Sequence, residues 1–519
     1  MSTVMLPGPR RPQTAKKLKS LEELAAVVAR LKRRGKRVVL CQGVLDLLHI
    51  GHIRHFEQAR QHGDVLVVTL TQDQFVNKGN HRPIFPEQLR AEAIAALDVV
   101  SYVAINRWPG AEETLRLVQP SIYCKGSEYR TVQGDIREAL LREIAAVESV
   151  GGCVEYTEDV TFSSSQLINT HLSVFPPETE AWLKSFRKKY SSDDVLRYLE
   201  AASRVKALVI GEAIVDEYVF CDGLGKSTKD PILAFRYNAT EQYLGGSLAV
   251  ANHLAGFCGE VGLLTLLGDV ERDEPLIRAG LRSNVQPHFI TQRGAPSIHK
   301  RRFVDTHTAA RMFELYVMGD EPLNREDAQA IDRSLATLLK SYDVVVVADY
   351  GHGMLTHSSV RTICEGARFL SVNTQANAGN RGFNTISKYP RADYVCLAGH
   401  EIALETRMRD ANWRDLVLEV TKRINCQAFT VTLGKYGSLH YKVDTGFIEV
   451  PALATRVTDR VGAGDAVLAA TSLLVAQQAP WDIVGFVGNL AGAEMVAELG
   501  NRIAIDKAAL TRHVTSLMK

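Results

Sequence analysis

The stretch Thr458-Asp459-Arg460-Val461-Gly462-Ala463-Gly464-Asp465-Ala466-Val467 opens a largely apolar run that continues to Ala476. A run of this composition predicts a buried helix, which places Asp465 and several backbone N–H groups at a helix N-terminus that favours an anion. Gly462 and Gly464 lack the Cβ atoms that keep a ligand away from the backbone. Phosphoryl transfer needs such amides to hold the negative charge that moves during the reaction. It also needs a carboxylate to take the proton from the attacking hydroxyl. An isolated Gly-x-Gly-Asp sequence is also typical of an ordinary helix cap, so the other motifs decide between these interpretations.

The composition excludes several classes of partner. A chain of 519 residues predicts about three domains, or two of which one is large. Lys and Arg number 61 and Asp and Glu number 59, so we expect no nucleic-acid partner and no membrane partner. The eight cysteines show no Cys-x-x-Cys spacing, and Met1–Ser20 lacks the apolar segment of a signal peptide. These features predict a cytoplasmic protein with reduced thiols.

The first part of the chain alternates short β-rich runs with amphipathic runs. The expected strands are 37–41, 65–70, 99–105, 121–124 and 153–156, and the expected helices are 21–34, 53–61, 86–97, 111–118 and 136–149. This alternation predicts a Rossmann-like α/β domain with a parallel sheet covered on both faces. In such sheets ligands bind at the carboxyl ends of the strands.

The first of these strand ends is Gly43-Val44-Leu45-Asp46-Leu47-Leu48-His49-Ile50-Gly51-His52, directly before a predicted helix. His49 and His52 lie three residues apart and therefore on one face of the helix start, with Gly51 clearing space between them. Two imidazoles there can donate hydrogen bonds to phosphate oxygens and steady the charge that builds when one phosphate attacks another. The pair is also compatible with a metal site or with ordinary surface histidines.

Gly43–His52 resembles the nucleotide-binding motif of the cytidylyltransferase-like nucleotidylyltransferases. Further matches follow in the family's order: Lys78-Gly79, Arg82-Pro83-Ile84, Lys125-Gly126-Ser127-Glu128-Tyr129 and Ser163-Ser164-Ser165. The resemblance implies that His49, His52 and Lys125 stabilise nucleotidyl transfer from ATP or CTP. It implies nucleotide-binding roles for Gly43, Asp46, Gly51, Arg82, Ser163, Ser164 and Ser165. Leu45 stands where the family usually has an aromatic residue, which we expect to alter packing and not chemistry.

Pro176-Pro177 marks the expected domain boundary, because a charged helical stretch follows it and a new strand begins near Lys206. We therefore expect a basic flexible tail at 1–20 and a nucleotidylyltransferase domain at 21–175. A linker helix at 176–200 then leads to a second domain at 201–519. In that domain the apolar runs 206–210, 261–267, 343–348 and 429–433 each end in glycine or a polar residue, which is typical of a site along one edge of an α/β sheet.

The second domain resembles the ribokinase-like (PfkB) sugar kinases over its full length, which implies a ribokinase-like α/β sandwich. Gly245, Gly246 and Asn252 match the family's sugar-binding stretch, and Asp216 matches the carboxylate that holds sugar hydroxyls. Thr432, Gly434 and Gly437 match the turn that borders the nucleotide. The resemblance makes Gly462, Ala463 and Gly464 the anion hole and Asp465 the catalytic base, which favours the catalytic interpretation over the helix cap.

Two departures from the family concern the nucleotide and its metal. The family commonly shows Asn-x-x-Glu near magnesium, whereas this chain has Ala398-Gly399-His400-Glu401. Glu401 is therefore the expected ligand of Mg²⁺, through water. Asn373-Thr374-Gln375 stands where the related heptose-phosphate kinases usually carry Asp-Pro-Lys. Either the sugar differs from a heptose phosphate, or the kinase activity is weakened.

Together the two halves resemble the bifunctional heptose-phosphate kinase/adenylyltransferases, although in that family the kinase half comes first. The resemblance implies phosphorylation of a sugar or sugar phosphate with ATP, and nucleotidyl transfer to a sugar phosphate with release of pyrophosphate. The product would be an activated nucleotide sugar such as ADP-heptose, and the assembly a homodimer. Two alternatives stay open: the kinase-like half is a regulatory module, or the first half is a cytidylyltransferase for a non-sugar alcohol phosphate.

Overall fold

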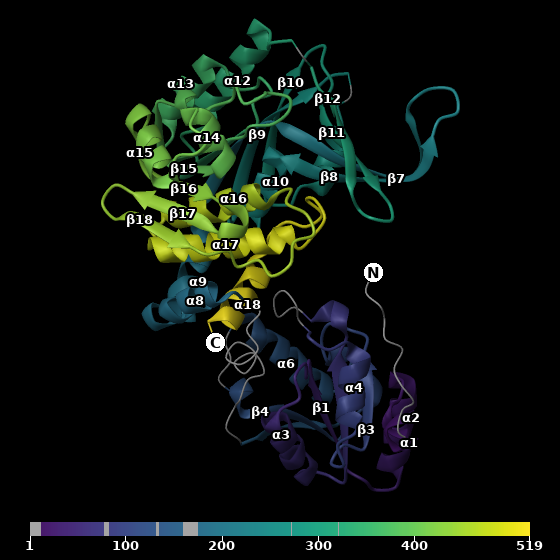
Figure 1. Cartoon of the computed structure of the whole chain (residues 1–519). Coiled ribbons are helices and arrows are strands. Elements are labelled where there is room, and N and C mark those ends of the chain that lie inside the picture. The colour runs from purple at the N-terminus through teal and green to yellow at the C-terminus, as the bar shows by residue number, and fades with distance from the viewer. Residues whose placement is uncertain are drawn as a thin grey trace. The chain divides into compact units, whose positions relative to one another are not determined.

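The computed structural model describes residues 12–76, 83–130, 134–158, 175–270, 272–319 and 321–518. The chain divides into two compact units, one that ends at Val174 and one that runs from Phe175 to Met518 (Figure 1). Each unit has its own sheets and its own hydrophobic clusters, so each has a separate core.

The first unit contains a five-stranded parallel sheet in the order β3-β2-β1-β4-β5. Its strands are β1 Val38–Gly43, β2 Val65–Thr71, β3 Tyr102–Asn106, β4 Ile122–Gly126 and β5 Cys153–Thr157. Its described helices are α1 Pro12–Lys17, α2 Leu21–Arg33, α3 Ile50–Gln61, α4 Glu87–Ala95, α5 Glu112–Val118 and α6 Gly134–Glu148. The alternation predicted from the sequence, and with it the Rossmann-like class, is confirmed.

The strand order of this sheet reverses between β1 and β4. Cys41 pairs with Cys124, so both strands end at the same edge of the sheet. Such a reversal is where open α/β sheets bind ligands. Cys41 packs with Phe56 of α3 on one face, whereas Tyr123 packs in the cluster that includes α2, α5 and α6 on the other. Burial on both faces explains why the β1 sequence is almost entirely apolar.

Arg90 of α4 is a buried cation that joins three segments of the first unit and is only 2% exposed. Its Nε donates to Phe85 O at 2.9 Å and its Nη2 donates to Thr71 O at 2.9 Å. Its Nη1 donates to Val44 O, and Asp73 forms an ion pair with it at 2.5 Å. Arg90 therefore ties the loop after β1 to the end of β2 and to the start of α4.

We expect Arg90→Met to destabilise the first unit by about 3–5 kcal/mol, because three carbonyls and a carboxylate lose their buried donor. Urea unfolding followed by far-UV circular dichroism measures this loss. The matched control is Arg116→Met, which removes a surface ion pair with Glu113 and should change stability by less than about 1 kcal/mol. Equal losses in the two variants would contradict the role of Arg90.

The second unit is built on a nine-stranded sheet in the order β10-β9-β6-β13-β14-β15-β16-β17-β18. The strands are β6 Lys206–Gly211, β9 Glu260–Gly268, β10 Val285–Gln292, β13 Val344–Asp349, β14 Leu370–Thr374, β15 Arg391–Ala398, β16 Asn425–Thr432, β17 Ser438–Lys442 and β18 Gly446–Val450. The pairs from β10 to β16 are parallel, whereas β17 and β18 are added antiparallel. The parallel strands therefore place their carboxyl ends along one edge.

A smaller four-stranded sheet has the order β12-β11-β7-β8. Its strands are β7 Ala213–Lys226, β8 Leu233–Gly246, β11 Ile298–Asp305 and β12 Arg311–Val317, which Figure 1 draws in teal. Asp459 ties it to the segment before α16, because its carboxylate accepts hydrogen bonds from Tyr218 Oη at 2.9 Å, from Arg311 and from Gly500 N at 3.0 Å. The polar residues 458–460, which precede the Gly-Ala-Gly-Asp sequence, are thus anchored to this second sheet through Asp459.

Helices cover both faces of the nine-stranded sheet. They are α8 Pro177–Lys189, α9 Ser192–Ala201, α10 Ser247–Ala255, α11 Glu274–Gly280, α12 Arg325–Leu338, α13 His357–Gly366, α14 Gly399–Thr406, α15 Trp413–Arg423, α16 Ala463–Ala476, α17 Trp481–Val496 and α18 Lys507–Leu517. The cluster on one face contains residues of α10, α16 and α17, which lie side by side in Figure 1, and the cluster on the other contains α12, α13 and α15. Among the described helices, none is both long and apolar enough to cross a bilayer.

The segment expected as a linker helix, 176–200, forms two helices that pack into the second unit. Leu183, Phe186 and Leu199 belong to its larger hydrophobic cluster. The rings of Phe186 and Phe486 lie 4.5 Å apart between centroids. The structure therefore places this segment in the core of the second unit, because its apolar side chains pack against α17.

Candidate active sites

Gly462 begins α16 in the left-handed region at φ +80°, a conformation that favours glycine. A Cβ at Gly462 would lie 2.0 Å from Asn501 Oδ1, whereas a Cβ at Gly464 would meet no heavy atom within 4 Å. The N–H groups of Ala463, Gly464 and Asp465 occupy the first turn, where no carbonyl four residues earlier can accept from them. The helix therefore opens with amides suited to an anion, as the sequence predicted.

Asp465 faces Tyr350 in this first turn of α16. Its Oδ1 accepts a hydrogen bond of 2.7 Å from Tyr350 Oη. Burial raises the pKa of Asp465 to about 6, against the lowering effect of that hydrogen bond. The charge of Asp216 adds to the rise in pKa and the charge of Lys300 opposes it, so these groups share one site. A carboxylate with such a pKa is ionised at neutral pH yet basic enough to accept a proton.

Glu212 positions the loop that carries Tyr350. Glu212 follows β6 directly, is 1% exposed, and accepts hydrogen bonds from Tyr350 N at 2.9 Å and His352 N at 3.0 Å. Burial and the charge of Asp349 raise the pKa of Glu212. Neither Glu212 nor Tyr350 was predicted to belong to the site, although they follow the expected strands 206–210 and 343–348 by two residues each.

Asp216 of β7 lies beside the glycine pair that leads into α10. Its Oδ1 accepts from Arg302 Nη1 at 2.6 Å and its Oδ2 accepts from Asn501 Nδ2 at 3.1 Å. A Cβ at Gly245 would lie 2.1 Å from Asp216 Oδ2, so this carboxylate position requires glycine. Gly246 has φ +60°, and a Cβ there would lie 2.6 Å from a backbone oxygen. The structure therefore brings Asp216, Gly245 and Gly246 together, and Asn501 links them to Gly462.

Lys300 of β11 contributes a buried cation that the sequence analysis did not single out. It is 5% exposed, and its Nζ lies 5.2 Å from the ring centroid of Tyr316 and 5.7 Å from that of Tyr350. No carboxylate of the described residues lies within ion-pair distance of it, and burial lowers its pKa. Nearby His352 has a buried Nε2 that finds no hydrogen-bond partner in the described chain, and burial lowers its pKa to about 4. Buried donors of this kind are costly unless an anion completes the site.

The structure does not bring Asn252 to this cluster. Its Nδ2 donates to Gly280 O at 2.9 Å, and its Oδ1 accepts from Arg282 N at 3.0 Å. The reason is helical geometry: Asn252 lies beyond the first turn of α10, on the side that faces α11. The amide that the resemblance assigned to a sugar is thus occupied by backbone groups.

Thr432 and Glu401 meet at neighbouring strand ends, because Ala398 of β15 pairs with Thr432 of β16. Glu401 is 8% exposed, and it accepts hydrogen bonds from Ala398 N at 2.7 Å and Ala376 N at 3.3 Å. Burial raises the pKa of Glu401 to about 7, and the charge of Asp465 adds to this rise. Glu401 therefore lies within electrostatic range of Asp465.

The turn after β16 has the geometry that its glycines predict. Gly434 has φ +59° and Gly437 has φ +89°, and a Cβ at Gly437 would lie 2.1 Å from Val450 O. Leu433 N donates to Gly437 O at 2.8 Å and closes the turn. The turn therefore lies at the same sheet edge as Thr432 and Glu401.

In the first unit, His49 and His52 form a close pair at the start of α3. Their ring centroids lie 3.9 Å apart with an interplanar angle of 31°. His49 Nδ1 accepts a hydrogen bond of 3.1 Å from Gly51 N, so a neutral His49 carries its proton on Nε2. Burial lowers the pKa of His49, which favours this neutral form. The two imidazoles therefore lie together at a helix N-terminus, whereas their role as phosphate donors stays a prediction.

Lys125 ends β4 at the same edge, but its ammonium is engaged within the first unit. Its Nζ lies 2.7 Å from Glu143 Oε2 and faces the rings of Tyr123 and Tyr129 at 4.9 and 4.5 Å from their centroids. Although burial opposes the change, Tyr123 and Glu143 raise the pKa of Lys125. A phosphate that reaches Lys125 must therefore share it with Glu143, a partner that the sequence analysis missed.

The remaining nucleotide-binding candidates of the first unit fall into two groups. Gly43 ends β1 at the strand edge. Asp46 is 4% exposed, and its Oδ1 accepts hydrogen bonds from Ile84 N at 2.6 Å and Phe85 N at 3.1 Å, so it holds the segment before α4. Arg82, Ser163, Ser164 and Ser165 lie outside the described residues.

Two family models match the chain. Residues 205–508 match the model of the pfkB family of carbohydrate kinases. The chain belongs to this family. Residues 40–198 match the cytidylyltransferase-like model, so both resemblances seen in the sequence are confirmed.

The curated relatives of this pfkB-family chain include bifunctional proteins named HldE. That of Geotalea uraniireducens (strain Rf4) is 39% identical over 150 residues, which cover 28% of this chain and 29% of the relative. That of Rhodopseudomonas palustris (strain BisB18) is 26% identical over 306 residues, which cover 58% of this chain and 62% of the relative. The aligned part is thus less than two thirds of the length of either relative.

A solved structure supports the fold of the pfkB unit. The tetrameric inhibited form of phosphofructokinase-2 from Escherichia coli aligns with a TM-score of 0.50 and 15% sequence identity, covering 61% of this chain and 100% of that chain. At this identity the likeness shows the fold alone, and it confirms the ribokinase-like architecture.

The residues of the pfkB unit fit a magnesium ion held through water and nucleotide phosphates. Within the described residues no cluster of three His, Cys, Asp or Glu side chains could bind a metal by itself. The charge of Asp465 nevertheless disfavours the ionised form of Glu401, and a nearby cation would offset that repulsion. Mg²⁺ commonly binds with few protein carboxylates and retains several waters, so Glu401 suits an outer position.

The departure at Asn373-Thr374-Gln375 leaves no charge at the end of β14. Asn373 Nδ2 donates to Cys396 O at 2.7 Å, and Gln375 N donates to Asp349 O at 2.8 Å. These groups tie neighbouring strand ends together. A lysine reaches the neighbourhood of Asp465 from the smaller sheet instead, namely Lys300 of β11.

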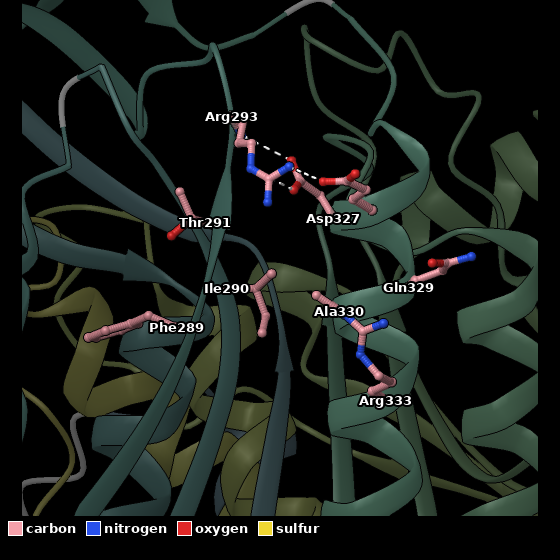
Figure 2. Close-up of a pocket in the computed structure, with 9 residues that line it drawn as sticks. Phe289, Ile290, Thr291, Arg293, Asp327, Gln329, Ala330 and Arg333 are labelled. Carbon is pink, nitrogen blue, oxygen red and sulfur yellow. Dashed lines mark hydrogen bonds and ion pairs between the residues drawn. The ribbon is translucent and has the colours of Figure 1, made fainter.

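A pocket of about 420 Å³ between β10 and α12 lies outside the predicted sites (Figure 2). Figure 2 shows Arg293 directed at Asp327, whereas Phe289 and Ile290 come from the edge strand. Arg293 pairs with both Glu326 and Asp327, so its charge is already balanced. None of the candidate residues named from the sequence lines this pocket.

Proposed function

We propose that the second unit phosphorylates a hydroxyl group of a sugar or sugar phosphate with ATP. The observation that carries this proposal is Asp465, a carboxylate with a raised pKa that stands beside open helix amides. Asp216 lies in the same site and suits the hydroxyl groups of the acceptor. Membership of the pfkB family supports the same reaction class.

Each residue of the kinase site has a separate role in the proposed phosphoryl transfer. Ionised Asp465 accepts the proton as the acceptor oxygen bonds to the γ-phosphorus, and the bond from that phosphorus to the bridging oxygen of ADP breaks. Tyr350 holds Asp465 in position, and Glu212 holds Tyr350. The amides of Ala463 and Gly464 take up the charge on the phosphoryl oxygens. When bound, Mg²⁺ neutralises charge on the nucleotide phosphates, with Glu401 as its expected water-mediated ligand.

For the first unit we propose nucleotidyl transfer from ATP or CTP to a sugar phosphate. A phosphate oxygen of the acceptor bonds to the α-phosphorus, and pyrophosphate leaves with the electron pair of the broken bond. His49 and His52 donate hydrogen bonds to the charge that builds, and Lys125 adds a cation. The cytidylyltransferase-like match supports this assignment.

In combination the units would yield an activated nucleotide sugar such as ADP-heptose. If the acceptor of the kinase reaction is itself a heptose phosphate, a separate phosphatase must remove the second phosphate between the two steps. The HldE relatives support this reading of the whole chain. A second candidate is a nucleotidylyltransferase with a weak, regulatory kinase unit, which the uncharged end of β14 and Ala398 favour. Incubating native protein with ATP and a panel of sugars and sugar phosphates, followed by CTP or ATP, separates the two. ADP formation supports the bifunctional enzyme, whereas pyrophosphate release alone supports the second candidate.

Lys300 provides a test of the acceptor class. We expect Lys300→Met to raise the KM for a phosphorylated acceptor by about 10- to 100-fold, because a charge-assisted hydrogen bond to phosphate is lost. Initial-rate kinetics with varied acceptor and varied ATP measure this effect. Lys422→Met, on the exposed surface of α15, is the matched control.

The two KM values identify which phosphate Lys300 contacts. An increase confined to the KM for ATP would place Lys300 on the transferred phosphoryl group. Unchanged KM values for both substrates would remove Lys300 from phosphate binding altogether.

We further propose a homodimer in the cytoplasm. The smaller sheet supports the dimer, because Phe313 and Leu315 on β12 are 49% and 43% exposed and Leu233 on β8 is 67% exposed. Light scattering after size exclusion measures the mass, and Phe313→Ser should shift a dimer towards the monomer. All eight cysteines are free thiols, which suits a reducing compartment.

A further inference from the structure

A second cavity of the kinase unit has the size of a metabolite site. It has a volume of about 480 Å³, opens to solvent, and lies between β8, α10, α11 and the loop that joins α17 to α18. Small-molecule sites commonly measure about 300–1,000 Å³. Arg282 and Arg502 line the cavity, whereas none of the described residues that line it carries a carboxylate. Its walls therefore present an excess of positive charge.

The two arginines differ in how their charges are balanced. Arg502 Nη2 pairs with Glu241 Oε2 at 2.7 Å, and Arg502 Nε donates to Tyr243 Oη at 3.1 Å. Arg282 Nη2 instead donates to Ile505 O at 3.2 Å, a neutral acceptor. Within the described part of the chain, Arg282 has no carboxylate partner. Its charge is therefore not balanced by an acid in the wall.

His253 adds a buried polar atom to the wall of the same cavity. It lines the cavity, is 1% exposed, and its Nδ1 accepts a hydrogen bond of 3.1 Å from Ile505 N. Because Nδ1 is an acceptor, the proton of the neutral ring resides on Nε2. That Nε2 is buried and has no hydrogen-bond partner in the described chain. A buried donor without an acceptor is uncommon in folded proteins, so this side of the cavity wall is incompletely satisfied.

One wall of the cavity is also a wall of the kinase site. Asn501 lines the cavity, and its Nδ2 donates to Asp216 Oδ2 at 3.1 Å. Asn501 Oδ1 lies against Gly462, and Gly500 N donates to Asp459 Oδ2 at 3.0 Å. A movement of this loop would therefore displace groups that contact both Asp216 and Gly462.

We propose that this cavity is a second anion site of the kinase unit, and that its occupant alters nucleotide binding through the loop at Asn501. The ligand is a small metabolite with carboxylate or phosphate oxygens, because the guanidinium fork matches both groups. A sugar hydroxyl fits less well, because the Asn252 amide, the expected sugar contact, is bonded to Gly280 and Arg282. The inference rests on the kinase assignment only for its regulatory part.

Crystals of the full chain, soaked separately with tungstate and with malonate, test the site. Tungstate presents the tetrahedral oxygens of phosphate and malonate presents carboxylates, so the two soaks distinguish the chemical sources. We expect density beside Arg282 in at least one soak, and its loss in Ala279→Phe, which fills the cavity. Arg278→Gln is the matched control, because Arg278 lies on the same helix and pairs with Glu274 outside the cavity. Crystals without density in the cavity in either soak would overturn the site.

The coupling is measured by calorimetric titration of ATP with and without the ion that binds. We expect the Kd for ATP to change by about fivefold or more in native protein and to stay constant in Ala279→Phe. Arg282→Gln, which removes the charge that no acid of the wall balances, is the second variant if Ala279→Phe fails to fold. An ion effect that persists in the variants comes from competition at the catalytic sites and overturns the coupling. Tungstate density at Gly462–Asp465 in the same crystals reports separately on the proposed kinase site.

Discussion

We expect Asp465→Asn to lower phosphoryl transfer by about 10²- to 10⁴-fold, while pyrophosphate release by the first unit keeps its native rate. The amide retains the size of the carboxylate and can still meet Tyr350, but it cannot accept the proton of the acceptor hydroxyl. ADP formation and pyrophosphate release, measured on the same preparation, check both halves of this expectation. Asp444→Asn, in the exposed turn between β17 and β18, is the matched control. Equal rates of ADP formation in native protein and Asp465→Asn would leave the second unit without a kinase role for Asp465.

The raised pKa of Asp465 predicts how kinase activity and protein stability change with pH. Because the pKa of Asp465 is raised to about 6, the ligand-free enzyme should gain kcat/KM as pH rises through about 6 and the base ionises. For stability the sign is opposite: a carboxyl whose pKa is raised on folding destabilises the native state once pH exceeds its unfolded pKa. Asp465→Asn should therefore unfold at a higher temperature than native protein at pH 7–8, and this difference should shrink towards about pH 4.

We expect His52→Asn to lower nucleotidyl transfer by about 10²- to 10³-fold, with the kinase reaction unchanged. The ring centroid of His52 lies 3.9 Å from that of His49 at the helix start, so the substitution removes one imidazole and a ring contact of the other. Pyrophosphate release from ATP and from CTP, with a sugar phosphate as acceptor, measures the loss. The matched control is His62→Asn at the far end of the same helix. A metal role for the pair predicts instead that chelators mimic the substitution in native protein.

Several parts of both candidate sites could be predicted because their causes are local. Gly462 needs a positive φ to start α16, and an apolar run follows it, so the short sequence determines the helix start and the position of Asp465. Gly434 and Gly437 likewise have positive φ values in a tight turn. At the start of α3, Gly51 N donates a hydrogen bond to His49 Nδ1, only two residues earlier in the chain. Each of these features depends on neighbours in the chain, which spacing and residue type reveal.

Other parts depended on contacts between distant residues and could not be predicted. Tyr350 and Asp465 are 115 residues apart, and Arg302 and Asp216 are 86 apart. Lys125 was expected on a phosphate, but in the folded unit it pairs with Glu143, because side chains alternate between the faces of a strand and α6 covers its face. Asn252 fits a motif by spacing, yet the direction of α10 turns its amide towards Gly280.

The sequence alone determined the two α/β units, the order of their motifs, and the glycines that open backbone amides at helix starts. Periodicity, strand ends and turn residues act over a few positions, so they can be recognised without a fold. Only the tertiary structure decided which ionisable groups share a site, as with Lys300, Glu212 and Asp465, because strand order and register bring distant residues within reach of one another. The same long-range packing created the cavity beside Asn501, whose lining comes from four separate segments of the chain.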